Sequence, residues 1–420
     1  MEIWHIRGGN RLFGSCRVQG SKNASLPVLA ATIALPNRSV IRNVPRLNDV
    51  SAAVSILSHL GCRVENTGQD NELAVDSRQV CRAEIPRGLM EEMRSSVIFM
   101  GALLARCGEA KLSLPGGCQL GKRPIDLHLS ALRAMGAEIE EEGSDLCCRA
   151  ERLHGVPIEL RFPSVGATEN IMLAACAAEG KTIIRGAAKE PEIVALQNYL
   201  RSLGVHIHGA GSDEITIDGA DARPEASFTV PSDRIAAATF ACACAAAGGR
   251  ILLSGVQYEH FSTVLHFLKC AGCDIIQFND IVEIASNGTL HAPGHIVTEP
   301  YPGFPTDAQP ILMAALLRAQ GTTRITETIF ENRYRQVGEL RRLGADIRLD
   351  GQEAAVHGVR SLRGASLTAS DLRGGAAMIV AALSAGGETT VIDAGHIARG
   401  YENLDDRLCA LGADVRLEHR

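Results

Sequence analysis

The chain has 420 residues, of which 46% are hydrophobic and 21% are charged, and this length favours two domains over a single compact core. A formal net charge of −6 argues against a general nucleic-acid or anionic-membrane surface, so any positively charged site must be local. The 13 cysteines include several in Ala-rich runs, which indicates free buried thiols in a reducing compartment.

The N-terminal residues are expected to form strands. Residues 1–6 have the pattern of a strand rather than of a signal peptide. A second short strand at residues 16–18 precedes the first helix and is expected to complete the second domain. The longest apolar runs, such as residues 235–247, are too short to span a bilayer. The sequence therefore predicts a soluble cytoplasmic protein that binds neither membranes nor nucleic acid.

One five-residue phrase, of the type Leu-Gly-Ala-Asp-Ile, recurs six times along the chain. Its glycines are separated by 75, 68, 68, 72 and 68 residues, so six units of about 70 residues fill the sequence. Units of this size are too long for the common solenoids, which indicates small α/β modules. The repeated glycines are Gly61, Gly136, Gly204, Gly272, Gly344 and Gly412.

Each unit follows the same order of predicted elements. An Ala-rich helix comes first, then a turn that usually contains glycine, a β-branched strand, an amphipathic helix and a second strand. The repeated glycine is expected to follow the end of the amphipathic helix, because glycine readily adopts the left-handed conformation found there. The Ala-rich helices are predicted at residues 23–35, 95–107, 167–178, 235–247, 307–319 and 374–385.

The Ala-rich helices are apolar on nearly every face, and a helix of that kind is buried. Three such helices in each domain, surrounded by sheet, predict an α/β fold of two inside-out barrels with three repeats each. The alternative is that they are ordinary core helices of a layered α/β protein. A break near Pro231 divides the chain into a first domain at residues 22–230 and a second domain at residues 1–21 plus 231–420.

A glycine-rich loop at residues 114–124 contains a candidate reactive side chain. Cys118 is followed by Lys122 and Arg123, and neighbouring cations lower the pKa of a thiol by stabilising the thiolate. The same cations can hold an anionic substrate, and the glycines let the backbone approach it closely. The alternative is an ordinary surface loop with an incidental cysteine.

Polar residues gather at the predicted starts of the Ala-rich helices. Helix N-termini bind phosphates and carboxylates, so two such ends facing each other across a cleft would suit a pair of anionic substrates. The alternative is that the aspartates only cap the helices, which is favoured for Asp233. At Asp307 the preceding Thr306 is a second cap candidate, so one of the two is spare. The residues concerned are Lys22, Asn23, Arg94, Ser164, Val165, Gly166, Asp233, Arg234, Asp307, Asp371 and Arg373.

Six stretches of the sequence together resemble a known family. They are residues 20–24, 114–127 (LPGGCQLGKRPIDL), 304–307, 330–333, 371–373 and 396–402. In this order they are similar to the UDP-N-acetylglucosamine 1-carboxyvinyltransferases, which are enolpyruvyl transferases of the EPSP synthase superfamily. The resemblance runs from about residue 3 to the end of the chain. It implies the pair of inside-out α/β barrels, with the active site in the cleft between the domains.

The resemblance also implies a reaction, the first committed step of peptidoglycan synthesis. The 3-hydroxyl of UDP-N-acetylglucosamine attacks C2 of phosphoenolpyruvate, and the resulting tetrahedral ketal loses phosphate to leave an enol ether. These two small molecules are the implied partners. No metal or organic cofactor is implied.

Catalytic roles are implied for residues at matching positions. Cys118 is the implied proton donor and the site of a covalent phosphoenolpyruvate adduct, and Asp307 is the implied base for the hydroxyl. Lys22, Arg123 and Arg399 are the implied cations around the phosphate and carboxylate of phosphoenolpyruvate, where fixed charges stabilise charge that moves during the reaction.

Further positions match substrate contacts of the family. Asp371 and Arg373 correspond to polar positions of the active site. Phe162 replaces a lysine found in some members, which puts that nucleotide contact in doubt. The implied contacts to the UDP-sugar are Asn23, Arg94, Arg123, Pro124, Ile125, Asp126, Leu127, Phe162, Pro163, Ser164, Val165 and Ile329.

Two alternative functions remain open. 3-Phosphoshikimate 1-carboxyvinyltransferase shares the fold and the phosphoenolpyruvate chemistry, but the Cys118 loop and residues 123–128 argue against it. The other alternative is a catalytically idle paralogue that binds or regulates, since a fold does not determine a function. The intact cationic and acidic positions argue against that reading.

Overall fold

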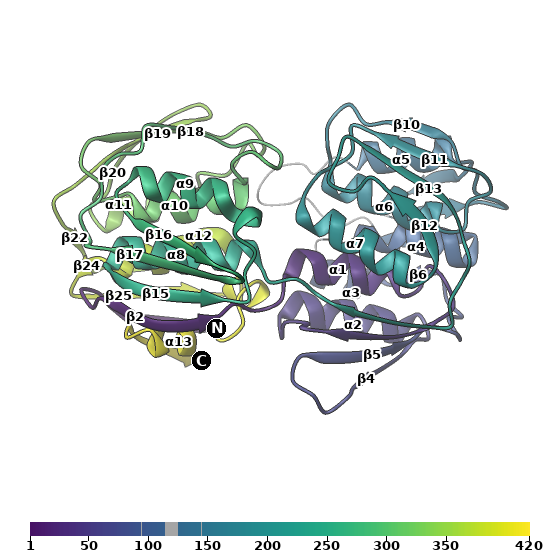
Figure 1. Cartoon of the computed structure of the whole chain (residues 1–420), viewed down its shortest axis with the longest axis horizontal. Helices are drawn as coiled ribbons and strands as arrows, with labels where there is room; N and C mark the ends of the chain where they lie inside the picture. The colour runs from purple at the N-terminus through teal and green to yellow at the C-terminus, as the bar shows by residue number, and fades with distance from the viewer. Residues whose placement is uncertain (94, 114–124, 144) are drawn as a thin grey trace. The chain divides into compact units, whose positions relative to one another are not determined.

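The computed structural model describes residues 1–93, 95–113, 125–143 and 145–420 (Figure 1). The chain forms two compact units, each with its own hydrophobic core. We call Gly20–Pro231 the central unit, and Met1–Gln19 together with Ser232–Arg420 the terminal unit. The chain thus leaves the terminal unit after Gln19 and returns to it after Pro231.

The central unit contains the first three repeats. Its Ala-rich helices are α1 (Lys22–Ala31), α4 (Phe99–Cys107) and α6 (Val165–Ala175). The other helices are α2 (Asn48–His59), α3 (Arg87–Glu92), α5 (Asp126–Ala134) and α7 (Pro191–Ser202). The strands are β3 (Arg38–Arg42), β4 (Arg63–Asn66), β5 (Glu72–Asp76), β6 (Glu84–Ile85), β7 (Glu109–Ser113), β8 (Glu138–Glu142), β9 (Asp145–Arg149), β10 (Pro157–Glu159), β11 (Thr182–Arg185), β12 (Val205–His208), β13 (Glu214–Ala220) and β14 (Glu225–Thr229).

The terminal unit contains the other three repeats. Its Ala-rich helices are α8 (Arg234–Ala247), α10 (Gln309–Ala315) and α12 (Leu372–Leu383). The amphipathic helices are α9 (Ser262–Cys270), α11 (Val337–Arg342) and α13 (Leu404–Ala410). The strands are β1 (Glu2–Arg7), β2 (Leu12–Arg17), β15 (Gly249–Ser254), β16 (Asp274–Phe278), β17 (Ile281–Ser286), β18 (His295–Val297), β19 (Thr322–Thr326), β20 (Asp346–Asp350), β21 (Glu353–His357), β22 (Leu362–Arg363), β23 (Ser366–Thr368), β24 (Ala385–Gly386), β25 (Glu388–Asp393) and β26 (Asp414–His419).

Within the described residues the strands form six four-stranded sheets, one for each repeat, and β22 pairs with β24. In each of the six, one edge strand runs parallel to the strand that follows the Ala-rich helix, and the other pairings are antiparallel. The fold is therefore mixed α/β. The sheet orders are β14-β3-β5-β4, β6-β7-β9-β8, β10-β11-β13-β12, β2-β15-β17-β16, β18-β19-β21-β20 and β23-β25-β1-β26.

The N-terminal strands complete two sheets of the terminal unit. β2 pairs in parallel with β15, so this strand does complete a sheet of the terminal unit, but it spans residues 12–17 and not the predicted 16–18. β1 lies between β25 and β26 in the sheet of the last repeat. In the central unit, β14 completes the sheet of the first repeat in the way that β2 completes its sheet. It lies at the end of this unit and pairs in parallel with β3.

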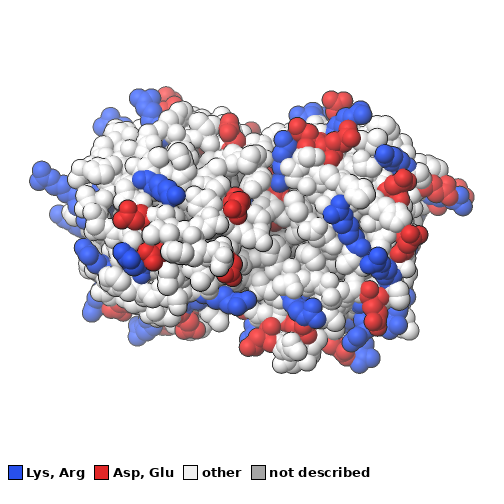
Figure 2. Space-filling view, viewed as in Figure 1, with Lys and Arg blue, Asp and Glu red and all other residues white. Residues whose placement is uncertain are grey.

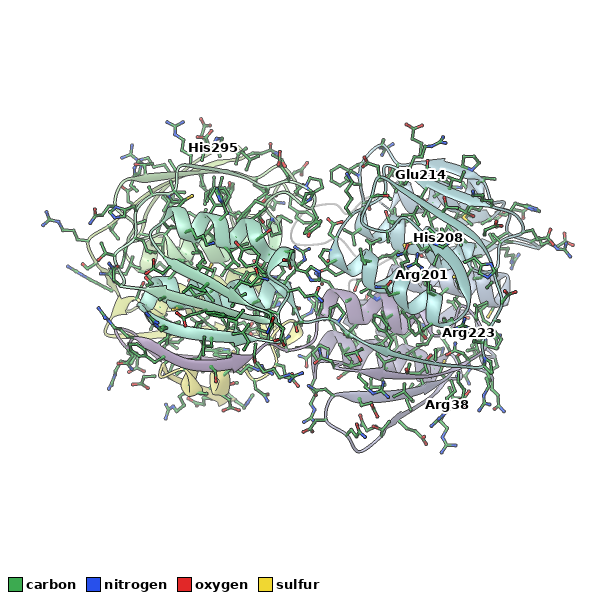
Figure 3. The ribbon with its side chains drawn as sticks, in the orientation of Figure 1. Arg38, Arg201, His208, Glu214, Arg223 and His295 are labelled. Atoms are coloured by element: carbon green, nitrogen blue, oxygen red, sulfur yellow. The ribbon has the colours of Figure 1, made fainter. Side chains whose placement is uncertain are left out.

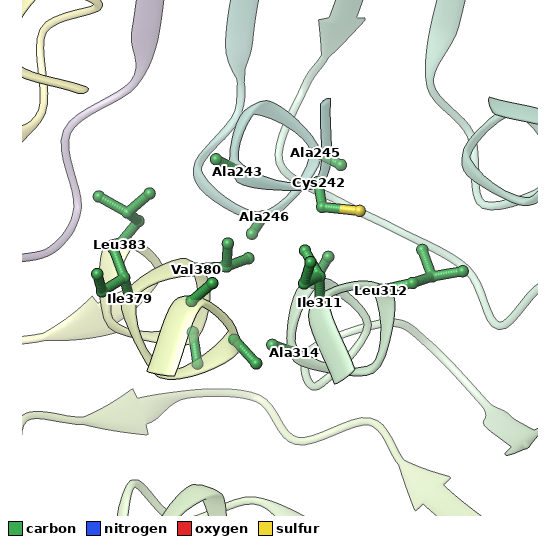
Figure 4. Close-up of a cluster of buried hydrophobic side chains, with 14 of the residues drawn as sticks. Cys242, Ala243, Ala245, Ala246, Ile311, Leu312, Ala314, Ile379, Val380 and Leu383 are labelled. Atoms are coloured by element: carbon green, nitrogen blue, oxygen red, sulfur yellow. The ribbon is translucent and has the colours of Figure 1, made fainter. Parts of the chain in front are cut away.

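The Ala-rich helices are buried, as their composition predicts. Every α8 residue from Ile235 to Ala246 is buried, and α8, α10 and α12 each pack against the other two (Figure 4). Small side chains let such helices approach closely. In α4, a Cβ atom on Gly101 would lie 2.2 Å from the carbonyl oxygen of Asn170 in α6, so only glycine fits there.

The helix boundaries differ from the predictions by up to four residues, at the starts as well as at the ends. The helix predicted at residues 307–319 is α10, which is shorter and follows a 3₁₀ turn at Thr306–Ala308. A 3₁₀ turn at Ser96–Ile98 likewise precedes α4. The six repeated glycines all have positive φ, between 93° and 103°, so the prediction that they follow the amphipathic helices is confirmed.

Candidate functional site

In the terminal unit, Asp307 lies on the 3₁₀ turn before α10 and is held by two buried arginines. Arg333 donates from Nη2 to Asp307 Oδ1 at 2.5 Å, and Arg373 donates from Nη2 to Asp307 Oδ2 at 3.0 Å. The carboxylate is 30% exposed, whereas the Arg333 and Arg373 side chains are 3% and 4% exposed. The two arginines thus fix the orientation of the carboxylate, and its exposed part is open to contact with a ligand.

Arg373 is the centre of a buried network. It donates from Nη1 to the Tyr401 hydroxyl at 3.3 Å, and that hydroxyl lies 2.8 Å from Thr239 Oγ1 of α8. Burial alone would lower the pKa of Arg373, but Asp307, Tyr401 and Asp233 together raise this pKa above its usual value. Burial also raises the pKa of Tyr401, and Arg373 opposes that shift. Arg373 is therefore a fixed positive charge beside Asp307.

The turn that carries Asp307 is fixed by a buried glutamate. Glu327 is 1% exposed and accepts hydrogen bonds from Thr306 Oγ1 at 3.1 and 3.0 Å. It also accepts from the backbone N–H of Ile329 at 2.9 Å and of Phe330 at 3.0 Å. One carboxylate thus positions both the Asp307 turn and the partly buried Ile329. The alternative that Thr306 or Asp307 caps the helix is wrong, because neither the 3₁₀ turn nor α10 has a side-chain cap, and these side chains bond to Glu327 and to the arginines instead.

Two other aspartates do cap helices. Asp233 Oδ1 accepts from the N–H groups of Ile235 and Ala236, both at 2.9 Å, at the start of α8. Asp371 Oδ1 accepts from Arg373 at 3.1 Å and from Gly374 at 2.9 Å, at the start of α12. The capping role expected for Asp233 is confirmed, and Asp371 has the same role in addition to any contact with a ligand.

Arg399 ends a 3₁₀ turn at Ile397–Arg399 and is partly buried. The fully buried Asp393 accepts hydrogen bonds from the N–H groups of His396 and Ile397, both at 2.9 Å. The end of strand β25 therefore fixes the turn that carries Arg399.

In the central unit, Lys22 is the first residue of α1, directly after its cap Ser21. The Lys22 ammonium lies 3.1 Å from Asp49 Oδ2 in the first turn of α2. Lys22 is 13% exposed and Asp49 is 2% exposed, so this ion pair is largely shielded from water. The neighbouring Asn23 is partly buried.

The starts of α5 and α6 meet in the same unit. Asp126 in the first turn of α5 forms an ion pair with Arg161, which lies just before the Phe162–Val165 stretch. His128 of α5 packs against Gly166 of α6, where an added Cβ atom would lie 3.0 Å from the His128 ring. The structure thus brings residues 126–127 and 162–165 into one region. Ile125 and Leu127 are partly buried there, as are Pro163, Ser164 and Val165, while Phe162 is 43% exposed.

His128 is held neutral at this junction. Burial lowers the pKa of His128 to about 4, with a weaker opposing effect from Asp126. Its Nδ1 lies 2.8 Å from Nδ2 of the fully buried Asn170 in α6, so Nδ1 accepts this hydrogen bond. Asn170 also donates to the carbonyl of Val97 at 3.2 Å and accepts from the Gly101 N–H at 2.7 Å. One amide therefore joins α4, α5 and α6.

The profile of the family described as EPSP synthase (3-phosphoshikimate 1-carboxyvinyltransferase) matches residues 6–408. UDP-N-acetylglucosamine 1-carboxyvinyltransferase 2 of Caldanaerobacter subterraneus subsp. tengcongensis is 48% identical over 415 residues, which cover 99% of each chain. UDP-N-acetylglucosamine 1-carboxyvinyltransferase 1 of Carboxydothermus hydrogenoformans is 45% identical over 416 residues, which cover 99% of this chain and 98% of the relative. The chain belongs to the UDP-N-acetylglucosamine 1-carboxyvinyltransferases, within the EPSP synthase family.

Solved structures agree with this family. The enolpyruvyl transferase NikO from Streptomyces tendae superimposes with a TM-score of 0.90 at 26% identity, covering 99% of this chain and 98% of that chain. EPSP synthase from Acinetobacter baumannii gives a TM-score of 0.76 at 20% identity with full coverage of both chains, which supports the fold alone.

Four of the site residues implied by the family resemblance lie outside the described residues: Arg94, Cys118, Arg123 and Pro124. Four buried cysteines that the structure describes show how burial changes the pKa of a thiol in this protein, for comparison with Cys118. Burial raises the pKa of the Cys62, Cys148, Cys176 and Cys244 thiols to about 12, so these thiols are poor nucleophiles at neutral pH.

Several residues of the site were not identified from the sequence. Arg333 lies in one of the stretches that resemble the family but had no assigned role, and Glu327, Asp49 and Asn170 had no signal of their own. Their common feature is burial of a charged or amide side chain, which becomes visible only when the fold is known.

Two further observations concern the described part of the chain. No group of three or more His, Cys, Asp or Glu side chains within it is arranged to hold a metal ion. None of its helices has the length and apolar character needed to cross a membrane.

Proposed function

We propose that this protein transfers the enolpyruvyl group of phosphoenolpyruvate to the 3-hydroxyl of UDP-N-acetylglucosamine and releases phosphate, as a transferase of peptidoglycan synthesis. The identities of 43–48% to UDP-N-acetylglucosamine 1-carboxyvinyltransferases over nearly the full chain carry this proposal. The structural observation that supports it is the partly exposed Asp307 carboxylate fixed between Arg333 and Arg373.

The reaction needs two proton transfers in its first step. Asp307 accepts the proton of the attacking hydroxyl as the sugar oxygen bonds to C2 of phosphoenolpyruvate. Cys118 donates a proton to the methylene carbon, which becomes a methyl group in the tetrahedral ketal, and the same thiol forms the covalent phosphoenolpyruvate adduct. In the second step the C2–O bond to phosphate breaks and phosphate leaves with the electron pair, while the Cys118 thiolate takes back a methyl proton and the enol ether forms.

Fixed cations stabilise the charge that moves during these steps. Lys22 is held by Asp49, and the Arg399 turn is held by Asp393, so both can face an anion without large rearrangement. Together with Arg123 we assign them to the phosphate and carboxylate of phosphoenolpyruvate. Asp371 and Arg373 complete the polar environment of the reacting groups.

We assign the UDP-sugar to the region where α5 and α6 begin. Helix N-termini bind phosphates, and Ser164 already caps α6 by accepting from the Ala167 N–H at 3.3 Å. The assigned contacts are Asn23, Arg94, Arg123, Pro124, Ile125, Asp126, Leu127, Phe162, Pro163, Ser164, Val165 and Ile329. This proposal includes domains at residues 22–230 and at 1–21 plus 231–420, built as inside-out barrels with the active site between them, and a cytoplasmic location.

Phosphate release from phosphoenolpyruvate tests the proposal. The protein is incubated with UDP-N-acetylglucosamine in one reaction and with shikimate 3-phosphate in a parallel reaction. We expect release only with the UDP-sugar. Release only with shikimate 3-phosphate would overturn the substrate, and no release from folded protein in either reaction would favour an idle paralogue.

A further inference from the structure

Gln19 is the last residue of the terminal unit before the chain passes into the central unit. Its side chain is 3% exposed and bonds to the segment directly after Arg399. Gln19 Nε2 donates to the Gly400 carbonyl at 3.1 Å, and Gln19 Oε1 accepts from the Glu402 N–H at 2.7 Å. One buried amide therefore holds residues 400–402 from a position 381 residues before Gly400.

The two partners of Gln19 require both a donor and an acceptor. The Gly400 carbonyl needs a donor and the Glu402 N–H needs an acceptor, and an amide offers one of each on neighbouring atoms. A carboxylate offers acceptors alone, and a carboxylic acid matches both partners only while it is protonated. Because the site is buried, a backbone group that loses its partner here would stay unpaired at a cost in free energy.

Some other links between elements lie at the surface and use charged side chains. Figure 2 shows Lys and Arg side chains interspersed with Asp and Glu on the face in view. Arg201 and His208, both labelled in Figure 3, form such a link between α7 and β12. Arg201 donates to the Ile207 carbonyl at 2.8 Å and to His208 Nδ1 at 2.9 Å, but it is exposed, so water can replace these bonds. Gln19 differs because its bonds are shielded from water.

The backbone of Gln19 joins a third segment to the same place. Its carbonyl accepts from the Asp233 N–H at 2.9 Å, directly before α8. Arg407 of α13 supports the other partner, because it donates from Nε to the Glu402 carbonyl at 2.9 Å. The N-terminal segment, the start of α8 and the turn that carries Arg399 are thus bonded together through residue 19.

The segment that Gln19 holds also belongs to the polar network beside Asp307. Tyr401 lies between the two bonded residues, and its hydroxyl accepts from Arg373 Nη1 at 3.3 Å. Arg373 also donates to Asp307. A shift of this segment would therefore move the backbone of Arg399 and disturb a partner of Arg373.

We propose that Gln19 is a positioning residue for Arg399, and through it for the binding of phosphoenolpyruvate. This inference rests on the proposed function, which assigns Arg399 to the phosphate and carboxylate of that substrate. Asp393 holds the start of the turn through the N–H groups of His396 and Ile397, and Gln19 holds the segment that follows it. With both sides fixed, the backbone at Arg399 is in place before the anion arrives, so binding does not have to order it.

Gln19→Met tests the proposal, because methionine has a similar volume but no N–H to donate. Phosphate release with each substrate varied in turn is the measurement. We expect KM for phosphoenolpyruvate to rise roughly tenfold, with a smaller change in kcat. KM for UDP-N-acetylglucosamine should not change, because its assigned contacts do not include this segment. A merely structural role would lower the melting temperature without this selective change in KM.

Gln19→Glu adds a signature that depends on the donated hydrogen bond. An ionised carboxylate would face the Gly400 carbonyl with an oxygen, whereas the protonated form can still donate, and burial favours the protonated form. Relative to the wild type at the same pH, KM for phosphoenolpyruvate should be raised at about pH 8.5 and approach the wild-type value at about pH 6. Gln277→Glu makes the same change at an exposed position on β16 and should follow the wild-type profile. The charged and titratable groups on the segments around residue 19 are Arg17, Asp233, His396, Arg399, Tyr401, Glu402 and Arg407.

Hydrogen exchange separates this inference from the proposed function, because it needs no substrate. The Glu402 N–H is buried and bonded in the wild type, so Gln19→Met should speed exchange in the peptide of residues 397–404 roughly tenfold and leave other peptides unchanged. No phosphate release by the wild type would overturn the proposed function, and with it the substrate assigned to Arg399. An active wild type would overturn this inference alone if Gln19→Met left KM for phosphoenolpyruvate unchanged, or changed KM equally for both substrates.

Discussion

The two units fix their candidate site residues in different ways. In the terminal unit, Asp307 is held by charge, with one carboxylate between the buried Arg333 and Arg373. In the central unit, the α5–α6 junction is held by neutral groups, with His128 hydrogen-bonded to Asn170. In the same unit, Lys22 forms an ion pair with the carboxylate of Asp49.

This difference separates two tasks. A cluster with two fixed cations around one carboxylate creates an electric field before the substrate arrives, so its charges act on the reacting atoms. A neutral network joins helices and sets where their N-termini point, so it acts on position and stability. Substitutions in the terminal unit should therefore change kcat most, whereas substitutions in the central unit should change stability or KM.

The largest effect is expected for Asp307→Asn. The amide keeps the shape of the side chain but cannot accept the hydroxyl proton, so kcat should fall by about 10²–10⁴-fold, the usual contribution of a general base. Phosphate release at saturating substrates measures this change. Asp346→Asn, which alters an exposed carboxylate on β20, is the control. A loss in kcat of less than tenfold for Asp307→Asn would rule out Asp307 as the base.

The second-largest fall in kcat is expected for Arg333→Lys. Arg333 donates to both the Thr306 carbonyl and Asp307, and a single ammonium cannot reproduce this planar geometry. We expect kcat to fall by about 10²-fold, similar to the loss of one fixed donor in other enzymes. Arg324→Lys on the surface of the same unit is the control. Full activity in Arg333→Lys would mean that charge alone, without orientation, is sufficient.

These two residues also show what the sequence could and could not predict. The repeat and the apolar helices predicted the six units and their buried helices, because periodicity and composition are local properties. The family resemblance singled out Asp307, while a helix cap at this turn stayed open as the alternative. The sequence could not decide between them, because the Asp307 partners Arg333 and Arg373 lie 26 and 66 residues away and only the fold brings them together. Glu327 and Asp49 were missed for the same reason.

The third prediction concerns the neutral network. The pKa of His128 is lowered to about 4, so the folded protein takes up this proton later than the unfolded chain does as the pH falls. The stability contributed by neutral His128 is therefore fully present above pH ~6.5 and is lost as the pH falls through the window down to ~4. Between pH 7.5 and pH 5 this amounts to about 2 kcal/mol.

Urea unfolding of the wild type and of His128→Gln at pH 7.5 and pH 5 measures this loss of unfolding free energy. Glutamine can accept the hydrogen bond from Asn170 but does not titrate, so the variant should lose less stability on acidification. His206→Gln, which changes an exposed histidine of the same unit, is the control. Equal acid sensitivity of His128→Gln and the wild type would show that His128 does not carry the effect.

The smallest effect is expected for Asp49→Asn, which removes the charge that holds Lys22 and keeps a hydrogen-bond acceptor in place. A hydrogen bond between charged groups contributes about 1.5–3 kcal/mol, and part of it remains with asparagine, so we expect a rise of about tenfold in KM for phosphoenolpyruvate. The value of kcat should change less, because Lys22 itself is still present. Asp76→Asn, which alters a more exposed ion pair with Arg78, should leave KM unchanged. A fall in kcat as large as that of Arg333→Lys would mean that the Lys22–Asp49 pair acts on the reacting atoms, and the division of tasks between the two units would then be wrong.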